Sequence, residues 1–147
     1  MSVRDVAEYV LRKCGPMTAM KLQKLVYYAQ AWSLVWDERP LFNERIEAWA
    51  NGPVCRALYA AHHKQFMVEP GQILSGDPAL DADAERTIDS ILEFYGSKSA
   101  QWLSDLTHLE DPWNAARKRA GVPDGAPCEE EITLADMHEY YSGLLPQ

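Results

Sequence analysis

Residues 17–37, MTAMKLQKLVYYAQAWSLVWD, constrain the fold most strongly, because they predict a helix that is apolar on two opposite sides. Two stripes share its surface: Leu22, Leu25, Val26, Ala29, Trp32 and Trp36 form the first, and Met20, Tyr27, Ala31 and Leu34 form the second. A helix on a protein surface needs only one apolar stripe. We therefore expect a helix over about residues 18–36, capped by Thr18, that runs through the middle of the domain.

The other periodic segments predict a mainly α fold, a single-domain bundle of six or seven helices around this central helix. Capping residues place helix starts after Ser2, Ser99 and Thr133, and Asp111-Pro112 predicts another helix with Asp111 as its cap. The length of 147 residues suits one domain over residues 1–147.

One segment departs from the helical pattern. The pattern over about residues 40–50 predicts a short β-hairpin with its turn at Asn43-Glu44-Arg45. Pro53 suits the first position of a helix, so we expect a helix to begin at NGPV. Residues 67–85 are rich in proline, glycine and aspartate and predict a surface loop.

Composition argues for an ordinary folded protein of a reducing compartment. Hydrophobic residues make up 47% of the chain, but no apolar run approaches the about 20 residues that a membrane span needs. The N-terminus lacks the layout of a signal peptide, and three separated cysteines suit free thiols. We therefore expect a cytoplasmic protein without a membrane partner, a metal or a cofactor. His62 and His63 diverge on a helix, and we interpret them as solvated.

The net charge of −8 is unevenly distributed, with +3 in residues 1–65 and −11 in residues 66–147. The total argues against a non-specific nucleic-acid binder. Lys21 and Lys24 break a local rule, because they lie near the N-terminal end of the central helix, where its dipole disfavours cations. We expect acidic residues of the second half to pair with them, with a functional role as the alternative.

The sequence contains no P-loop, GxGxxG, GxSxG or HExxH motif, so we predict that the chain is not an enzyme. The densest polar cluster is Thr107-His108 with Glu110-Asp111, near a predicted helix junction. Residues that tie two helix ends together give the same pattern, and we favour that interpretation. An enzyme built on His108 stays as a third hypothesis.

An ordered set of short motifs resembles one known family, the SocA-like antitoxins with a Panacea domain. The set spans residues 17–117 and comprises Lys21-Leu22 and Lys24-Leu25 with Tyr27, Leu41-Phe42, Glu47-Ala48-Trp49, Gly52-Pro53-Val54, Thr107-His108, Pro112-Trp113 and Arg117. Each motif is weak alone, but their order is specific.

The resemblance implies the antitoxin of a type II toxin–antitoxin system, often encoded on phages or other mobile elements, that neutralises a protein toxin by direct contact. Its partner would be a toxin encoded by the adjacent gene, with a protease or chaperone machinery as a further class of partner. Interface anchors are typically Trp, Tyr and Arg. The candidate partner-binding residues are Lys21, Lys24, Tyr28, Trp49, Arg56, Tyr59, His108 and Trp113. Of these, we expect Tyr28, Trp49, Arg56, Tyr59 and Trp113 to be exposed.

The alternative function is a winged-helix-like, DNA-binding transcriptional regulator of a mobile element, since helices and a hairpin can form that fold. Against it, a central helix that packs on both sides has few side chains left to read bases.

Overall fold

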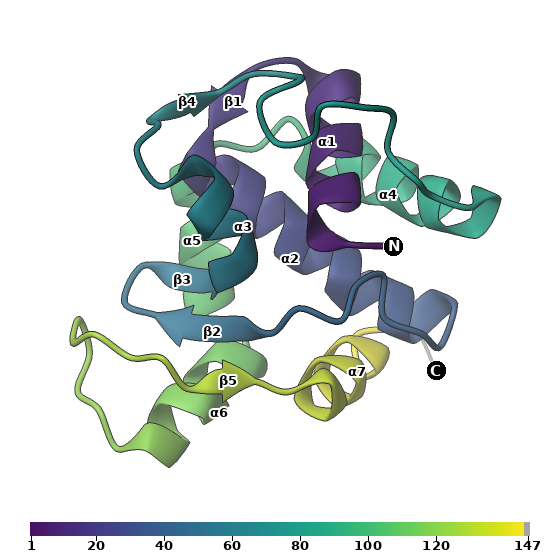
Figure 1. The fold of residues 1–147 in the computed structure, drawn as a ribbon. Helices are drawn as coiled ribbons and strands as arrows, with labels where there is room; N and C mark the ends of the chain where they lie inside the picture. The colour runs from purple at the N-terminus through teal and green to yellow at the C-terminus, as the bar shows by residue number, and fades with distance from the viewer. Residues whose placement is uncertain (146–147) are drawn as a thin grey trace.

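The computed structural model describes residues 1–145, so the last two residues of the expected 1–147 domain lie outside it. This part of the chain contains seven α-helices and two small antiparallel sheets at the outside of the bundle, which confirms the mainly α prediction (Figure 1). The helices are α1 (Val3–Cys14), α2 (Ala19–Trp36), α3 (Arg56–His62), α4 (Ala82–Tyr95), α5 (Ala100–His108), α6 (Asp111–Ala120) and α7 (Leu134–Ser142). None of these helices is long and apolar enough to cross a bilayer.

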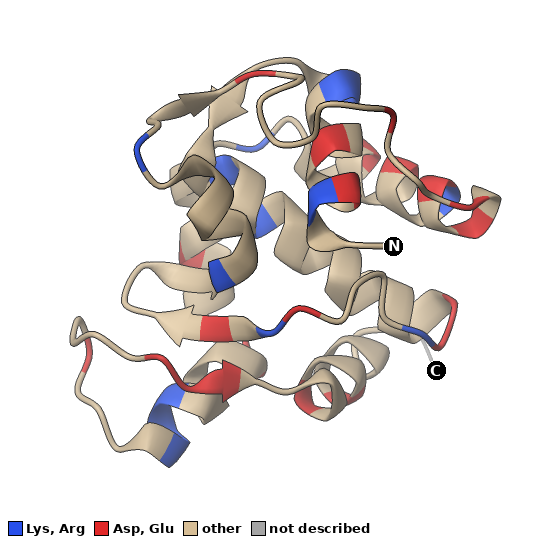
Figure 2. Ribbon diagram, in the orientation of Figure 1, with Lys and Arg blue, Asp and Glu red and all other residues tan. Residues whose placement is uncertain are grey.

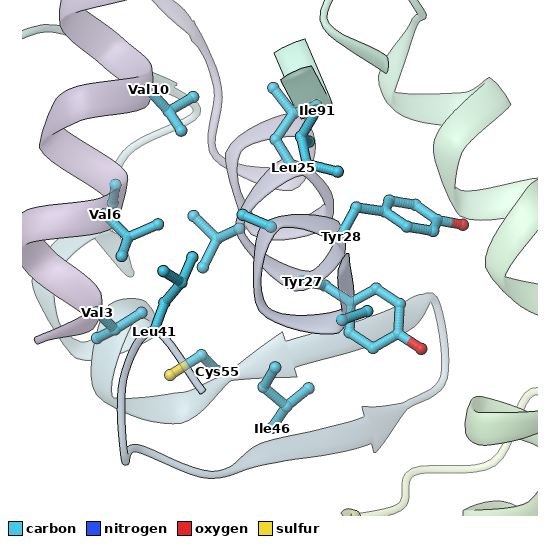
Figure 3. Packing of buried hydrophobic residues seen from close by; sticks show 14 of the residues in the cluster. Val3, Val6, Val10, Leu25, Tyr27, Tyr28, Leu41, Ile46, Cys55 and Ile91 are labelled. Carbon is cyan, nitrogen blue, oxygen red and sulfur yellow. The ribbon is translucent and has the colours of Figure 1, made fainter. Parts of the chain in front are cut away.

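The central helix α2 is buried on both sides, as predicted. Every residue from Leu22 to Leu34 is buried, and α2 packs against α1, α4, α5, α7 and the strand Gly52–Cys55. Figure 3 shows valines of α1 facing one side of α2 while Tyr27 and Tyr28 extend from the other. The ends differ from the prediction, because Met20 and Trp36 lie in the first and last turns and are 40% and 45% exposed.

Local capping chemistry fixes most helix starts. Ser2 and Asp5 form the predicted capping box of α1, and Thr18, Ser99 and Thr133 each accept a backbone N–H at the start of their helices. Helix α6 begins one residue earlier than predicted: its cap is Glu110, with Asp111 first and Pro112 second. The Glu110 carboxylate points into the core instead of bonding the helix N-terminus.

The β-hairpin prediction was wrong in position. Strands β2 (Ile46–Trp49) and β3 (Gly52–Cys55) pair with Ile46 opposite Cys55, and β5 (Glu131–Ile132) adds to the other edge of β2. The predicted helix start at Pro53 is therefore a strand. Proline is tolerated there because β3 is an edge strand, and edge positions need no N–H donor.

The segment expected to be the first hairpin strand is instead a buried loop strapped to α2. The Gln30 side chain donates to the Phe42 carbonyl oxygen at 2.8 Å and accepts from the Leu41 N–H at 2.7 Å. Leu41 and Phe42 are thereby buried against the core. A side-chain amide thus replaces the strand partner that the segment lacks.

The second sheet and the following loop lie against α1 and the start of α2. Strand β1 (Met17–Thr18) pairs with β4 (Met67–Val68). The loop predicted over residues 67–85 is shorter and covers residues 69–81, because β4 takes its first two residues and α4 begins at Ala82. Its backbone is bonded to α1: Gly71 N–H donates to Glu8, and Ala79 N–H donates to Asp5. Figure 2 shows acidic residues concentrated on α4 and around β5, in line with the negative second half of the sequence.

Candidate functional site

The turn between β2 and β3 is held rigidly by side chains from α5 and α6. Four successive carbonyl oxygens accept a hydrogen bond: Ala48 from Arg117 (2.9 Å), Trp49 from Trp113 Nε1 (2.9 Å), Ala50 from His108 Nε2 (3.3 Å) and Asn51 from Ser104 Oγ (2.6 Å). The polar cluster at the α5–α6 junction therefore ties elements together, in agreement with the interpretation that the sequence favours. His108 and Trp113 therefore donate hydrogen bonds to the hairpin backbone.

An open pocket of about 500 Å³ borders this hairpin. It is formed by the first turns of α2, the hairpin, α3 with the residues after it, and the segment 127–129 before β5. Its size falls within the range of ordinary ligand sites. Its lining residues are Ala19, Met20, Gln23, Lys24, Trp49, Ala50, Asn51, Val54, Arg56, Tyr59, His62, His63, Gln65, Pro127, Cys128 and Glu129.

Lys24 lies at the base of the pocket and is 2% exposed. A Cβ added to Gly52 would lie 2.6 Å from the Lys24 Cε, so the absence of a side chain at Gly52 makes room for the lysine. Within residues 1–145 its ammonium forms neither an ion pair nor a hydrogen bond, which contradicts the expected pairing with acids. Burial lowers the Lys24 pKa to about 8.

Lys21 shows a different environment one turn earlier on α2. Its Nζ donates to the Gly96 carbonyl oxygen at the end of α4, at 2.7 Å. The expected acidic partner is again wrong, because a helix C-terminal carbonyl takes its place. Lys21 does not line the pocket.

Gln23 and His62 form a buried polar pair beside Lys24. The Gln23 Oε1 accepts from the Cys55 N–H (2.9 Å), and its Nε2 donates to the Cys55 carbonyl oxygen (3.2 Å). These two bonds fix the orientation of the amide. The Gln23 Nε2 is therefore also the donor in its 2.9 Å bond to His62 Nε2. His62 is therefore neutral, with its proton on Nδ1. Its pKa is lowered chiefly by burial, with further contributions that include the Lys24 charge. The expectation of a solvated His62 was wrong.

The rim of the pocket carries an aromatic and ionic cluster. Arg56 pairs with Glu47 at 3.0 Å and Glu129 at 2.7 Å, and its guanidinium lies over the Trp49 ring. The Trp49 and Tyr59 rings meet edge to face at 5.0 Å. Burial works to raise the Glu47 pKa, but hydrogen bonds from Arg56 and Trp49 outweigh it and the pKa is lowered.

A second buried cluster lies under α2 and does not line the pocket. The Glu110 carboxylate accepts from the Tyr28 hydroxyl at 2.6 Å and the Tyr141 hydroxyl at 2.7 Å, and Tyr141 lies 3.0 Å from the Tyr27 hydroxyl. Burial raises the Glu110 pKa, opposed by the two tyrosine donors. This cluster joins α2, α6 and α7.

The pocket brings together half of the sequence-predicted partner residues: Lys24, Trp49, Arg56 and Tyr59. The expected exposure of Tyr28 and Trp113 was wrong, since they are 0% and 5% exposed. Both fill the core and satisfy their polar atoms there. Sequence reasoning missed Gln23 and His62, whose pairing joins residues 39 positions apart.

The arrangement suits recognition. In residues 1–145, no three His, Cys, Asp or Glu side chains are placed to hold a metal ion. The chemistry offered is one unpaired cation, aromatic walls and amide groups on a fixed hairpin. The fold and pocket therefore define a mainly α protein with an open pocket whose hairpin wall is held by hydrogen bonds from α5 and α6.

Comparisons with known proteins identify the family. The family described as "Antitoxin SocA-like, Panacea domain" matches residues 22–114. The chain is also 31% identical over 138 residues to Antitoxin SocA of Caulobacter vibrioides (strain NA1000 / CB15N), covering 83% of this chain and 73% of that protein. No solved structure matches. The chain belongs to the SocA-like antitoxin family, which confirms the resemblance seen in the sequence.

Proposed function

We propose that this protein is the antitoxin of a type II toxin–antitoxin system and neutralises a protein toxin by direct contact. The contact is made through the surface formed by the residues that line the pocket, which we call the pocket face. Membership of the SocA-like antitoxin family is the observation that carries the proposal. The toxin is encoded by the adjacent gene of a phage or other mobile element, and the pair acts in the cytoplasm. A protease or chaperone machinery would act after this contact.

The residue types and rigidity of the pocket face support its assignment as the interface. Trp49, Arg56 and Tyr59 belong to the three residue types that dominate binding energies in protein interfaces. The hairpin beneath them is fixed by hydrogen bonds from α5 and α6, so little ordering entropy is lost on binding.

The winged-helix alternative receives no such support. A wing that contacts DNA needs a turn free to enter a groove or follow the backbone. Here the turn carbonyls of Trp49, Ala50 and Asn51 are occupied by α5 and α6 side chains. The helix with the most suitable length, α2, is buried on both sides.

Co-expression tests the proposal. The product of the adjacent reading frame is expressed alone and with this protein; we expect growth arrest that this protein relieves, and a complex that purifies as one species. Arg56→Ala and Tyr59→Ala are each expected to weaken the complex at least about tenfold. Arg86→Ala, on the exposed side of α4, is the matched control. Relief of arrest without any complex would refute direct neutralisation.

A further inference from the structure

Lys24 is the one charged lining residue of the described pocket that lacks an opposite charge. Arg56 and Glu129, the other charged residues there, pair with each other at 2.7 Å. In residues 1–145, every fully buried polar side-chain atom has a hydrogen-bond partner, and the Lys24 ammonium has none. The ammonium is therefore not fully buried. Because Lys24 lines the pocket, we take its remaining exposure to face the pocket.

A buried ammonium without a partner lowers the free energy of unfolding of the unbound protein. Burial of a charge without a partner opposes folding, whereas a bound anion would compensate it. With a pKa of about 8, Lys24 is still mostly protonated at neutral pH. The pocket thus presents a positive charge in a poorly solvated site, where a charge-assisted hydrogen bond is strong.

We propose that the Lys24 ammonium binds a carboxylate of the toxin, supplied by an Asp or Glu side chain beside an apolar residue that packs on Trp49 and Tyr59. This assignment rests on the proposed function and deepens it. One ammonium balances one carboxylate, whereas a phosphate would leave an uncompensated negative charge in the pocket.

The apolar rim favours a protein as the source of this carboxylate. Met20 and Tyr59 line the pocket and are 40% and 38% exposed, and Phe66, which follows the lining residue Gln65, is 80% exposed. Large exposed apolar residues around a polar centre are typical of protein interfaces. A small carboxylic acid could not cover this rim.

Matched peptides test the chemistry without the toxin. The whole protein, with its lysine side chains observed by NMR, is titrated with acetyl-Leu-Asp-amide, acetyl-Leu-Asn-amide and sodium acetate. We expect the Asp peptide to shift the Lys24 signals and to bind at least about tenfold more tightly than the Asn peptide. Lys24→Met is expected to abolish that preference, and Lys64→Met, an exposed charge outside the pocket, to retain it.

Three results of this titration would overturn the assignment. Equal binding of the Asp and Asn peptides would remove the role of the charge. Acetate that binds as tightly as the Asp peptide would make this a site for small carboxylic acids. No binding of any probe up to about 10 mM would leave Lys24 without a carboxylate ligand. Because the peptide comparison uses the unaltered protein, it does not depend on the folding of a variant.

The toxin provides the second measurement. Lys24→Met is expected to weaken its binding at least about tenfold, and Lys64→Met less than about twofold. Equal binding by Lys24→Met and the unaltered protein would refute the assignment even if the Asp peptide binds. If the adjacent gene product binds neither protein, the proposed function fails, whereas the peptide titration still decides the role of Lys24.

Discussion

We expect Lys24→Met to make the protein more stable at neutral pH, although it removes a residue of the proposed interface. Methionine has a similar length and flexibility, so it can occupy the same channel over Gly52. It carries no charge and therefore avoids the desolvation that lowers the Lys24 pKa. Stability given up at a residue without structural partners is typical of functional sites.

The size of the gain follows from the pKa. Lowering the Lys24 pKa from 10.5 to about 8 corresponds to a cost of about 3 kcal/mol for the charged side chain in the folded protein. The residue is 2% exposed, so solvent screening reduces this figure little. We therefore expect the free energy of unfolding of Lys24→Met to exceed that of the unaltered protein by up to about 3 kcal/mol at pH 7.

The pH dependence distinguishes this cause from a general improvement in packing. Between about pH 8 and 10.5 the unfolded chain binds more protons at Lys24 than the folded protein does, so the stability of the unaltered protein gains on that of Lys24→Met as pH rises. The difference is expected to fall from about 3 kcal/mol at pH 7 to about 2 kcal/mol at pH 9. Buried tyrosines titrate in both proteins and cancel in the difference.

Urea unfolding of the two proteins at a series of pH values measures this difference, with Lys64→Met as the control for loss of one positive charge. A Lys24→Met variant that is less stable at pH 7 would show that the ammonium has a stabilising partner. A gain that stays constant between pH 7 and 9 would assign it to packing instead of charge.

Three further changes test other parts of the fold. Gly52→Ala places a Cβ 2.6 Å from the Lys24 Cε on a backbone with φ of +122°, and we expect a loss of more than about 1 kcal/mol in urea unfolding. Tyr141→Phe removes a donor to the buried Glu110 carboxylate, and a loss of about 1–3 kcal/mol is expected at pH 7; an unchanged midpoint would contradict it. Because the His62 pKa is lowered, the unfolded chain binds more protons below about pH 6.5, so acid destabilises the protein; His62→Gln is expected to lose less stability between pH 7 and 5 in thermal melts.

The helices could be predicted because their signals are local. Ser2, Thr18, Ser99 and Thr133 each bond a backbone N–H within three residues, so the sequence near each start contains the whole interaction. The two apolar sides of α2 are likewise a property of one continuous segment.

The hairpin could not be placed because its position depends on distant partners. Pro53 suits either a helix start or an edge strand, and the local sequence does not choose. The choice is made by side chains such as Trp113, which bonds the Trp49 carbonyl from 64 positions away. No periodicity near residue 50 contains that information.

Only some residues of the candidate site could be predicted, because the position of the others also depends on distant partners. The position of Lys24 near the N-terminal end of α2 was a usable signal, because the helix dipole disfavours a cation there and no neighbouring residue in the sequence compensates it. The burial of Tyr28 and Trp113 was not readable, since an aromatic side chain suits a core and an interface equally. Each acquires its place through a hydrogen bond to another element.

Several residues that carry the family resemblance form the frame of the pocket, whereas Lys24 and Trp49 also line it. Gly52 accommodates Lys24, and His108 and Trp113 hold the hairpin backbone, so a change at any of them disturbs the fold. The lining residue Met20 and Phe66, which follows the lining residue Gln65, are exposed and can change at little cost in stability. A rigid frame that fixes one cation, surrounded by a replaceable rim, would let proteins of one fold bind different toxins while keeping the same central contact.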